Sequence, residues 1–137
     1  MTLTSALHYF PIASCPGIDK PEAAAYDKQW LVVDGAGGWL TPKENPKLAD
    51  IKVDVLFGYL VMRAPGMLRM DLPLDVLEDD DSVRRQATVC KQRIDVVDEG
   101  DLAAAWLSNF LGTPSRLAKV HPDSVPVVWP DFPLSAA

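Results

Sequence analysis

The chain of 137 residues is long enough for one domain with its own core, and 48% of its residues are hydrophobic, as in folded soluble proteins. Nineteen acidic and thirteen basic residues give a formal net charge of −6, which argues against non-specific nucleic-acid binding and against docking on an anionic membrane surface. No apolar run is long enough to span a bilayer, and residues 1–6 lack the features of a signal peptide. We therefore expect a cytoplasmic location, with neither nucleic acid nor a membrane as a partner.

Short β-type segments separated by turn signals run along most of the chain. Residues 51–57 alternate apolar and charged side chains with period two, which is typical of a half-buried strand. Residues 34–38 are rich in glycine and predict a hairpin turn rather than a phosphate-binding loop, and Pro65 with Gly66 predicts another turn. The expected strands are residues 4–12, 30–33, 39–41, 51–57, 59–64, 68–72, 85–89, 93–97 and 117–120, with a turn at 91–92.

The segment 98–112 has the start and stop signals of one complete helix. Asp101 is a good N-cap residue, Gly112 suits the left-handed end of a helix, and Pro114 prevents continuation. Apolar residues recur there at helical spacing, namely Leu102, Trp106, Leu107, Phe110 and Leu111. We expect a helix over residues 101–111 that packs onto the strands through Trp106 and Phe110.

Metal chemistry has few candidate ligands in this sequence. The two cysteines, Cys15 and Cys90, and the two histidines, His8 and His121, follow no zinc-binding spacing. Cys90 falls within an expected strand, which predicts a packed thiol. We expect two reduced cysteines, no metal ligands and no catalytic residues, because nucleophile elbows, HExxH motifs and P-loops are all absent from the sequence.

Two further segments stand out by composition. Residues 78–81 are four consecutive acidic residues, and we interpret them as a solvated loop because they lack the alternating spacing of a calcium loop. Residues 122–133 hold four prolines with apolar residues between them, which predicts an irregular tail that packs on the domain or on a partner.

Several motifs occur together in an order that resembles a known family. In chain order they are LHYFPIASCPGI (7–18), DKQWLVVD (27–34), WLTPKENPKL (39–48), APGM (64–67), DEGDLAAAWLSNFLG (98–112) and RLAKVH (116–121). Together they resemble the N-terminal β-barrel domain of MOSC-type molybdenum-cofactor proteins, over roughly residues 5–123.

The resemblance implies a fold and a domain organisation. The fold class is mainly β, a small and mostly antiparallel β-barrel with one C-terminal capping helix at about 101–111. Residues 1–123 are expected to form this barrel domain. The proline-rich tail, 124–137, is similar to the start of the linker that leads into a MOSC domain in two-domain relatives, and this sequence contains no such second domain.

The resemblance also implies two alternative functions. The preferred one is a non-catalytic binding or accessory module with an unknown ligand and a possible MOSC-domain protein as partner. The alternative is the barrel half of a molybdenum-cofactor-dependent reductase or sulfur-carrier enzyme, completed in trans by a separate MOSC polypeptide. Two-domain relatives use the molybdenum cofactor, whereas no cofactor is expected in the isolated chain.

The resemblance implies which positions contact the cofactor, and of these only Ser14 carries over unchanged. In two-domain relatives the barrel lends a Lys-Ser pair and an Arg to the phosphate end of the cofactor. Here these positions read Ala13, Ser14 and Lys28, and Lys43 replaces an arginine of a further motif. A lysine keeps the charge of arginine but lacks its bidentate fork. We therefore expect Ser14, Lys28 and Lys43 to form a degenerate cofactor-binding site, with ordinary surface residues as the alternative.

Overall fold

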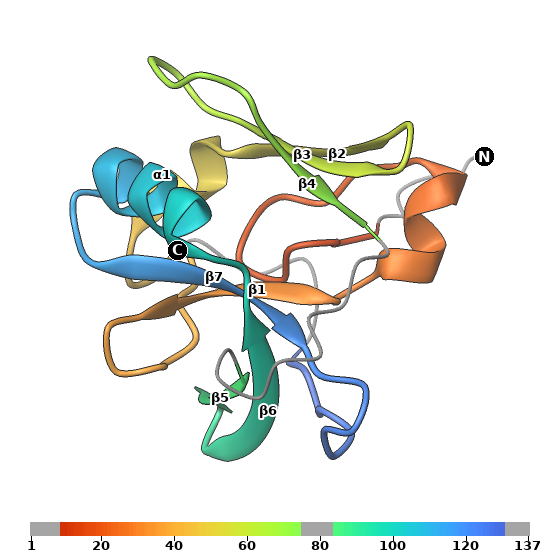
Figure 1. The fold of residues 1–137 in the computed structure, drawn as a ribbon, viewed down its shortest axis with the longest axis vertical. Helices are drawn as coiled ribbons and strands as arrows, with labels where there is room; N and C mark the ends of the chain where they lie inside the picture. The colour runs from red at the N-terminus through yellow and green to blue at the C-terminus, as the bar shows by residue number, and fades with distance from the viewer. Residues whose placement is uncertain (1–8, 75–83, 131–137) are drawn as a thin grey trace.

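Strands dominate the part of the chain that the structure describes. The structure is a computed structural model, and it describes residues 9–74 and 84–130 (Figure 1). The elements are η2 (Pro21–Tyr26), β1 (Trp30–Asp34), η3 (Pro46–Asp50), β2 (Lys52–Leu56), β3 (Tyr59–Arg63), β4 (Met70–Pro73), β5 (Arg84–Val89), β6 (Gln92–Asp98), α1 (Asp101–Leu111) and β7 (Ser115–Val120). The strands pair antiparallel in two sheets, of order β1-β7-β6-β5 and β2-β3-β4. The predicted fold class, mainly β and antiparallel with one C-terminal helix, is confirmed.

The four-stranded sheet closes on itself through the segment after β1. The Trp39 N–H donates to the Thr88 carbonyl of β5 at 2.9 Å, and the Leu40 N–H donates to the Val32 carbonyl of β1 at 2.9 Å. Gly37 has a φ of 86°, and a Cβ there would lie 2.9 Å from the Gln86 carbonyl oxygen. Only glycine fits such a close approach. Residues 37–40 and strands β1, β7, β6 and β5 thus enclose what we call the small barrel.

Strands β1 and β7 carry apolar residues on both faces and so belong to two cores. Trp30 and Val32 face a core that lies between β1, the three-stranded sheet and α1, which we call the large core. Leu31 and Val33 face the inside of the small barrel. The other buried members of this barrel core are Ala87, Val89, Ile94, Val96 and Ala118. A strand exposes alternate residues to opposite faces, so continuous apolar runs allow one strand to serve both cores.

Helix α1 spans the predicted residues but begins differently. The N-cap is Gly100, with a φ of 104°, and Asp101 lies in the first turn, so the predicted N-cap role of Asp101 is wrong. Leu102 is 81% exposed and does not belong to the buried face, also contrary to prediction. Gly112 ends the helix in the left-handed conformation, as predicted. Trp106 is buried against the large core, and its Nε1 donates to the Leu68 carbonyl at 2.6 Å.

Several predicted strands are shorter or absent. Within residues 39–41 only Trp39 makes a bridge, with Val33. The described part of 4–12 makes two isolated bridges, at Tyr9 and Ile12, and no strand. The β5–β6 turn is Cys90 with Lys91, both at positive φ, rather than 91–92. The two 3-10 turns, η2 and η3, begin with a proline and were not predicted.

The described part of the tail, residues 122–130, is irregular and covers one end of the small barrel. Gln92 Nε2 donates to the Val128 carbonyl at 2.7 Å, and Val128 N–H donates to Gln92 Oε1 at 2.9 Å. The Trp129 ring meets the Trp39 ring edge-on, with centroids 5.1 Å apart. The tail therefore packs on the domain itself. The acidic run 78–81 lies outside the described residues.

Candidate functional site

Ser14, the first predicted site residue, lies inside the fold. Its side chain is fully buried, and its Oγ accepts from the Val32 N–H at 3.0 Å and donates to the Val32 carbonyl at 3.4 Å. The hydroxyl thus joins the segment before η2 to strand β1. Neighbouring Ala13 is fully buried too, and its N–H donates to the Trp30 carbonyl at 2.7 Å.

Lys28, the second predicted residue, lines a cavity of about 380 Å³ between the segment before β1 and the tail. The polar residues that share the cavity with it include Gln29, His121 and Ser124. Lys28 Nζ lies 3.1 Å from the Asp27 carboxylate, which partly neutralises its charge. Lys28 also has a φ of 58°, in the left-handed region.

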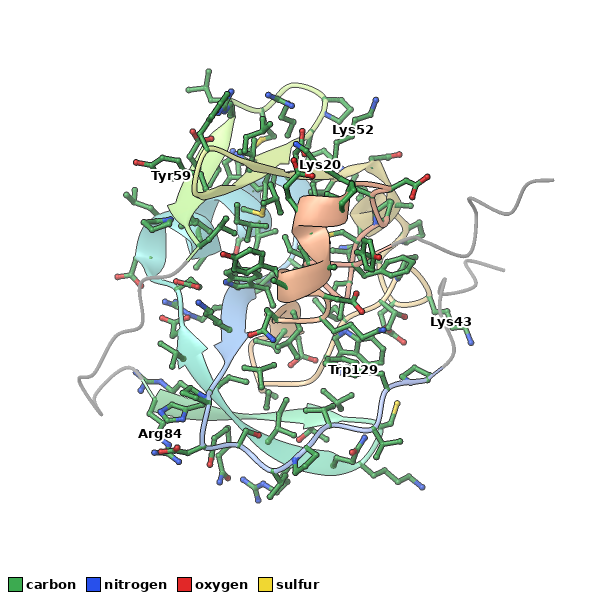
Figure 2. The ribbon with its side chains drawn as sticks, turned by 90° about the vertical axis from the view of Figure 1, so that its right-hand side faces the viewer. Lys20, Lys43, Lys52, Tyr59, Arg84 and Trp129 are labelled. Atoms are coloured by element: carbon green, nitrogen blue, oxygen red, sulfur yellow. The ribbon has the colours of Figure 1, made fainter. Side chains whose placement is uncertain are left out.

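Lys43 is exposed and projects from the loop before η3 (Figure 2). Its backbone N–H donates to Thr41 Oγ1 at 3.2 Å. The cavity that Lys28 lines contains neither Ser14 nor Lys43, so the three predicted residues do not share it.

The two cysteines differ in environment. Cys15 is buried in the large core, and burial raises the pKa of its thiol far above the usual range, so it stays a neutral thiol. Cys90 is exposed in the β5–β6 turn, so the predicted packed strand thiol is wrong. Both are free, and no cluster of three metal-ligating side chains occurs among residues 9–74 and 84–130.

A cavity of about 550 Å³ lies between the segment 16–20, just before η2, and strands β2 and β3, and charged residues make up much of its lining. Lys20 lies there with Nζ 3.0 Å from Asp54 Oδ1 and 2.8 Å from the Val55 carbonyl oxygen. Lys52 and Arg63 add two exposed cations at the rim (Figure 2 labels Lys20 and Lys52). The contacts of Lys20 join η2 to β2, which is a structural role.

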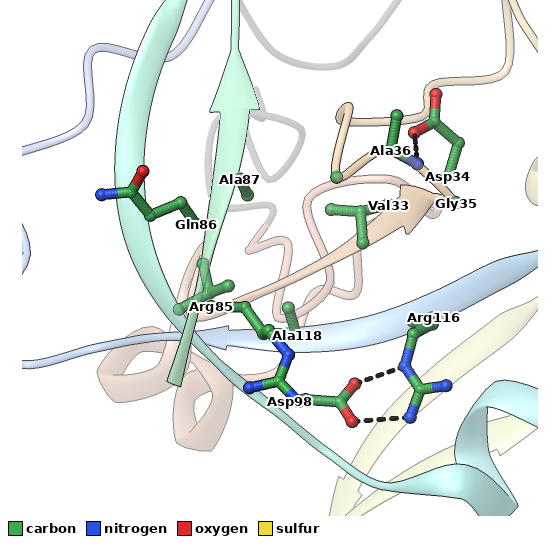
Figure 3. A pocket seen from close by; sticks show the side chains of 12 residues that line it. Val33, Asp34, Gly35, Ala36, Arg85, Gln86, Ala87, Asp98, Arg116 and Ala118 are labelled. Carbon is green, nitrogen blue, oxygen red and sulfur yellow. Dashed lines mark hydrogen bonds and ion pairs between the residues drawn. The ribbon is translucent and has the colours of Figure 1, made fainter. Parts of the chain in front are cut away.

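The open end of the small barrel forms a third cavity, of about 270 Å³, which we call the barrel mouth (Figure 3). Its floor consists of small side chains that also belong to the barrel core, namely Val33, Ala87, Val96 and Ala118. Its rim contains the turn after β1, with Asp34, and the charged residues Arg85, Asp98 and Arg116. An apolar floor with a few polar groups at the edge is typical of small-molecule sites.

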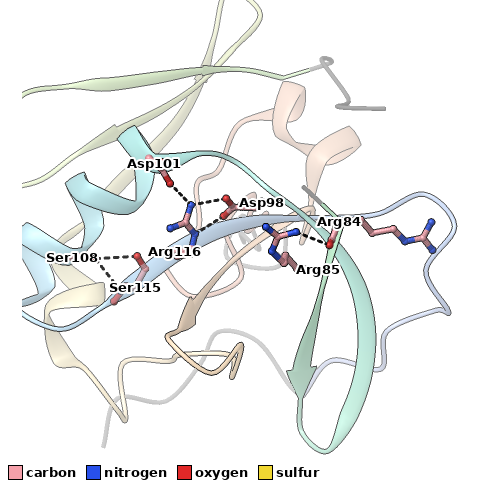
Figure 4. Close-up of polar contacts among 7 residues, drawn as sticks. All are labelled: Arg84, Arg85, Asp98, Asp101, Ser108, Ser115 and Arg116. Atoms are coloured by element: carbon pink, nitrogen blue, oxygen red, sulfur yellow. Dashed lines mark hydrogen bonds and ion pairs between the residues drawn. The ribbon is translucent and has the colours of Figure 1, made fainter. Parts of the chain in front are cut away.

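Arg116 of β7 is held in one orientation at this rim. Its Nε and Nη2 donate to the two Asp98 carboxylate oxygens at 2.8 and 2.6 Å, and Nη2 also donates to Asp101 Oδ1 at 2.8 Å (Figure 4). Hydrogen bonds from these two carboxylates raise the pKa of Arg116. Arg116 therefore ties the start of α1 to β6 and β7, and its charge is balanced internally.

The turn side of the rim is equally fixed. Asp34 Oδ1 accepts from the backbone N–H groups of Ala36 and Gly38, each at 2.9 Å. Arg85, on the opposite side, is exposed, and its Nη1 donates to the Arg84 carbonyl at 3.0 Å. In Figure 3 the Arg85 side chain reaches toward the Asp98–Arg116 pair.

Sequence reasoning did not single out the rim arginines. Arg116 stood within a recognised motif without an assigned role, and Arg85 lay within a predicted strand. Residues 34–38 were correctly predicted as a turn. The mouth forms only when β5, β6 and β7 close against this turn, and local periodicity does not report which strands are neighbours.

Among the residues that the structure describes, a small antiparallel barrel with a single capping helix defines the class of small β-barrel domains. The chain belongs to the family described as the MOSC N-terminal beta barrel domain, whose model matches residues 1–114. None of the described helices is both long enough and apolar enough to cross a membrane.

Relatives of known name support this assignment. The molybdenum cofactor sulfurase of Danio rerio is 37% identical over 131 residues, covering 89% of this chain and 16% of the sulfurase. The mitochondrial amidoxime reducing component 2 of Bos taurus is 32% identical over 119 residues, covering 80% of this chain and 35% of that protein. This chain therefore spans only a fraction of the length of these relatives.

A solved structure agrees over almost its full extent. The solution structure of a Bordetella bronchiseptica protein matches with a TM-score of 0.78 and 55% sequence identity, covering 96% of this chain and 99% of that chain.

Proposed function

We propose that the chain is a non-catalytic binding or accessory module of the MOSC family that works with a MOSC-domain protein in the cytoplasm. The observation that carries this proposal is the environment of the predicted cofactor contacts. Ser14 is occupied by the backbone of β1, and Lys28 is paired with Asp27. Groups that are internally satisfied in this way give a weak anion site and no reactive centre.

The Lys28 cavity is the place where we expect the remaining anion binding. Lys28 supplies an ammonium group, and His121 and Ser124 add polar groups on the tail side. An anion there must compete with the Asp27 carboxylate for Lys28. We therefore expect a phosphate-bearing pterin to bind with an affinity no better than about millimolar, or roughly 4 kcal/mol.

The alternative is the barrel half of a molybdenum-cofactor-dependent reductase or sulfur-carrier enzyme, completed in trans by a separate MOSC polypeptide. The names of the sulfurase and amidoxime-reducing relatives support this alternative. It requires a tighter cofactor contact than an internally paired lysine provides.

Titration of a pterin phosphate against the amide chemical shifts of the chain distinguishes the two. Weak binding with shifts around Lys28 and His121, strengthened by Lys28→Arg and unchanged by Lys43→Gln, supports the accessory module. Micromolar binding by the wild type contradicts it and favours the enzyme in trans. If no shifts appear near Lys28 in the wild type or in Lys28→Arg, the anion-site proposal is wrong. Ala13→Lys is not a useful gain-of-function variant, because Ala13 is fully buried.

A further inference from the structure

The cavity between residues 16–20 and strands β2 and β3, of about 550 Å³, brings cations together in a chain whose formal net charge is −6. Its charged lining consists of Lys20, Lys52, Arg63, Asp19 and Asp54. We call it the sheet-edge cavity, because β2 is an edge strand of the three-stranded sheet. From this lining we infer that the sheet-edge cavity binds a small phosphomonoester. The lining residues of this cavity and of the Lys28 cavity do not overlap, so the inference does not depend on the Lys28 cavity.

Two cations of this lining are paired across neighbouring strands. Lys52 of β2 is directly opposite Arg63 of β3 in the antiparallel register, and both side chains are exposed. Opposite residues of an antiparallel pair project from the same face of a sheet, so the two positive charges are neighbours. Like charges in such a pair are destabilising. An anion that binds between Lys52 and Arg63 removes this repulsion, which favours binding at this place.

The carboxylate of Asp54 does not provide that anion. Its Oδ1 lies 3.0 Å from Lys20 Nζ and accepts from the Val55 N–H at 2.8 Å. Asp54 and Lys20 therefore balance each other within the lining. Asp19 is exposed and contributes one negative charge, which Lys52 and Arg63 together outnumber.

A second carboxylate on the same face of the sheet is also held by another cation. The Asp71 oxygens accept from the Arg69 guanidinium at 2.7 and 3.0 Å. This hydrogen bonding is the main cause that lowers the pKa of Asp71, and the charge of Arg63 adds to it through space. Lys52 Nζ and the Arg63 guanidinium have no hydrogen bond or ion pair with the residues that the structure describes. Both groups can therefore donate to a ligand in the cavity.

The wall opposite these strands is fixed by backbone contacts. Tyr9 and Ile18 exchange two backbone hydrogen bonds, at 2.9 and 2.8 Å. A Cβ at Gly17 would lie 2.8 Å from the Tyr9 carbonyl oxygen, so the segment packs closely against its neighbour. Lys20 Nζ donates to the Val55 carbonyl at 2.8 Å and so ties this wall to β2. A ligand therefore enters a preorganised space, which lowers the entropic cost of binding.

The chemistry of the lining selects a phosphate ester among anions. A phosphomonoester carries about two negative charges near neutral pH, which matches the two neighbouring cations. The Arg63 guanidinium suits two phosphate oxygens, and the Lys52 ammonium acts as a point charge. Pro16, Ile18 and Val53 add an apolar part to the lining, against which a compact organic group can be buried.

Phenyl phosphate is a suitable probe, with inorganic phosphate and benzyl alcohol as comparators. In the full chain at low salt, we expect phenyl phosphate to shift the amide signals of residues 17–20, Lys52 and Arg63 with a Kd of about 1 mM. Inorganic phosphate should bind there about fivefold more weakly because it lacks the apolar group, and benzyl alcohol about tenfold more weakly because it lacks the charge.

Each of the other outcomes contradicts a specific part of the inference. Equal binding of inorganic phosphate would show that the ligand is not an ester, and equal binding of benzyl alcohol would show that charge plays no part. No shifts at residues 17–20 in titrations up to about 20 mM would overturn the site itself. Shifts of phenyl phosphate confined to Lys28 and His121 would also overturn it, while leaving the proposed function intact.

Neutral variants test the two cations against matched surface controls. Arg63→Gln and Lys52→Gln should each weaken phenyl phosphate about tenfold. Arg93→Gln and Lys43→Gln remove exposed cations outside the sheet-edge cavity and should leave the affinity unchanged. Equal losses in the cavity variants and the controls would show that the probe responds only to overall charge, and the assignment of the cavity would then be wrong.

A charge reversal separates binding from a structural role of Lys52. Lys52→Glu places an opposite charge across from Arg63, so the denaturation midpoint should equal or exceed that of the wild type. The same variant should lose phenyl phosphate binding, and the probe should no longer raise its midpoint as it does in the wild type. A lower midpoint without the probe would contradict the proposed repulsion. Retained binding would contradict the proposed site.

Discussion

The large core and the barrel core share strands β1 and β7 but are filled by different kinds of side chain. The large core takes Trp30, Leu117 and the helix residue Trp106, and α1 lies over it. The barrel core takes alanines and valines at the mouth and closes only at the other end, where Trp39 and Trp129 meet. The large core is therefore filled by bulky side chains, whereas the barrel core leaves an open cavity at the mouth.

Trp106→Ala is the change with the largest expected effect. Trp106 is 7% exposed and joins α1 to the large core, so we expect unfolding free energy to fall by about 3–5 kcal/mol. Leu102→Ala in the same helix, at an 81% exposed position, should change it by less than about 0.5 kcal/mol. Chemical denaturation measures both. An unchanged midpoint in Trp106→Ala would mean that the helix does not close the large core.

Larger side chains at one position of each core test how tightly the two cores are packed. Ala103, 1% exposed, belongs to the large core, so Ala103→Leu should destabilise the protein by about 1–3 kcal/mol. Ala118, 3% exposed at the mouth, adjoins an open cavity that can take the added methyl groups, so Ala118→Val should cost less than about 1 kcal/mol. Equal losses in thermal unfolding would show that the two cores are packed alike.

Removal of the Trp129 ring opens the covered end of the barrel core. The edge-on contact with Trp39 and the buried area together predict a loss of about 1–2 kcal/mol in Trp129→Ala. Val125→Ala is the matched control, because Val125 lies in the same tail but is 60% exposed. If denaturation does not distinguish the two variants, the tail does not contribute to the barrel core.

The smallest expected effects are pH-dependent and opposite in sign. Glu99 accepts a hydrogen bond from Trp30 Nε1 at 2.6 Å beside the large core, and burial raises its pKa. Between the pKa of Glu99 in the unfolded chain and its raised pKa in the folded protein, the folded state holds more protons. The free energy of unfolding therefore falls as the pH rises through this range. A hydrogen bond from Arg84 lowers the pKa of Asp95 on the outside of the small barrel. The contribution of the Asp95 carboxylate to stability is therefore lost as the pH falls through this lowered pKa.

Denaturation at several pH values compares the two carboxyl groups. From about pH 4 to about pH 7, Glu99→Gln should gain stability relative to the wild type, because glutamine carries no charge to desolvate. Over the acidic part of that range Asp95→Asn should lose stability relative to the wild type as the pH rises, by a small amount because Asp95 is screened by solvent. Parallel pH profiles for both variants would contradict this assignment.

Local sequence signals predicted the β-rich fold class, the span of α1 and the left-handed end at Gly112, because periodicity and turn residues act within one element. The start of α1 was less predictable. Asp101 looked like an N-cap in sequence, but Gly100 occupies that position and the carboxylate turns to Arg116, a residue far along the chain. Leu102 fitted the apolar spacing and is nevertheless 81% exposed, because helical periodicity alone does not report which part of a helix the rest of the fold covers.

The candidate sites divide in the same way. The sequence by itself determined that the chain is a MOSC N-terminal barrel domain, because the order of its short motifs can be read along the chain without knowing any tertiary contact. Only the tertiary structure decided that Ser14 is buried, that Lys28 faces Asp27 and that Arg85 and Arg116 meet around one opening. Burial and charge pairing depend on which strands become neighbours, and closure of the small barrel through residues 37–40 is a long-range event that no local pattern encodes.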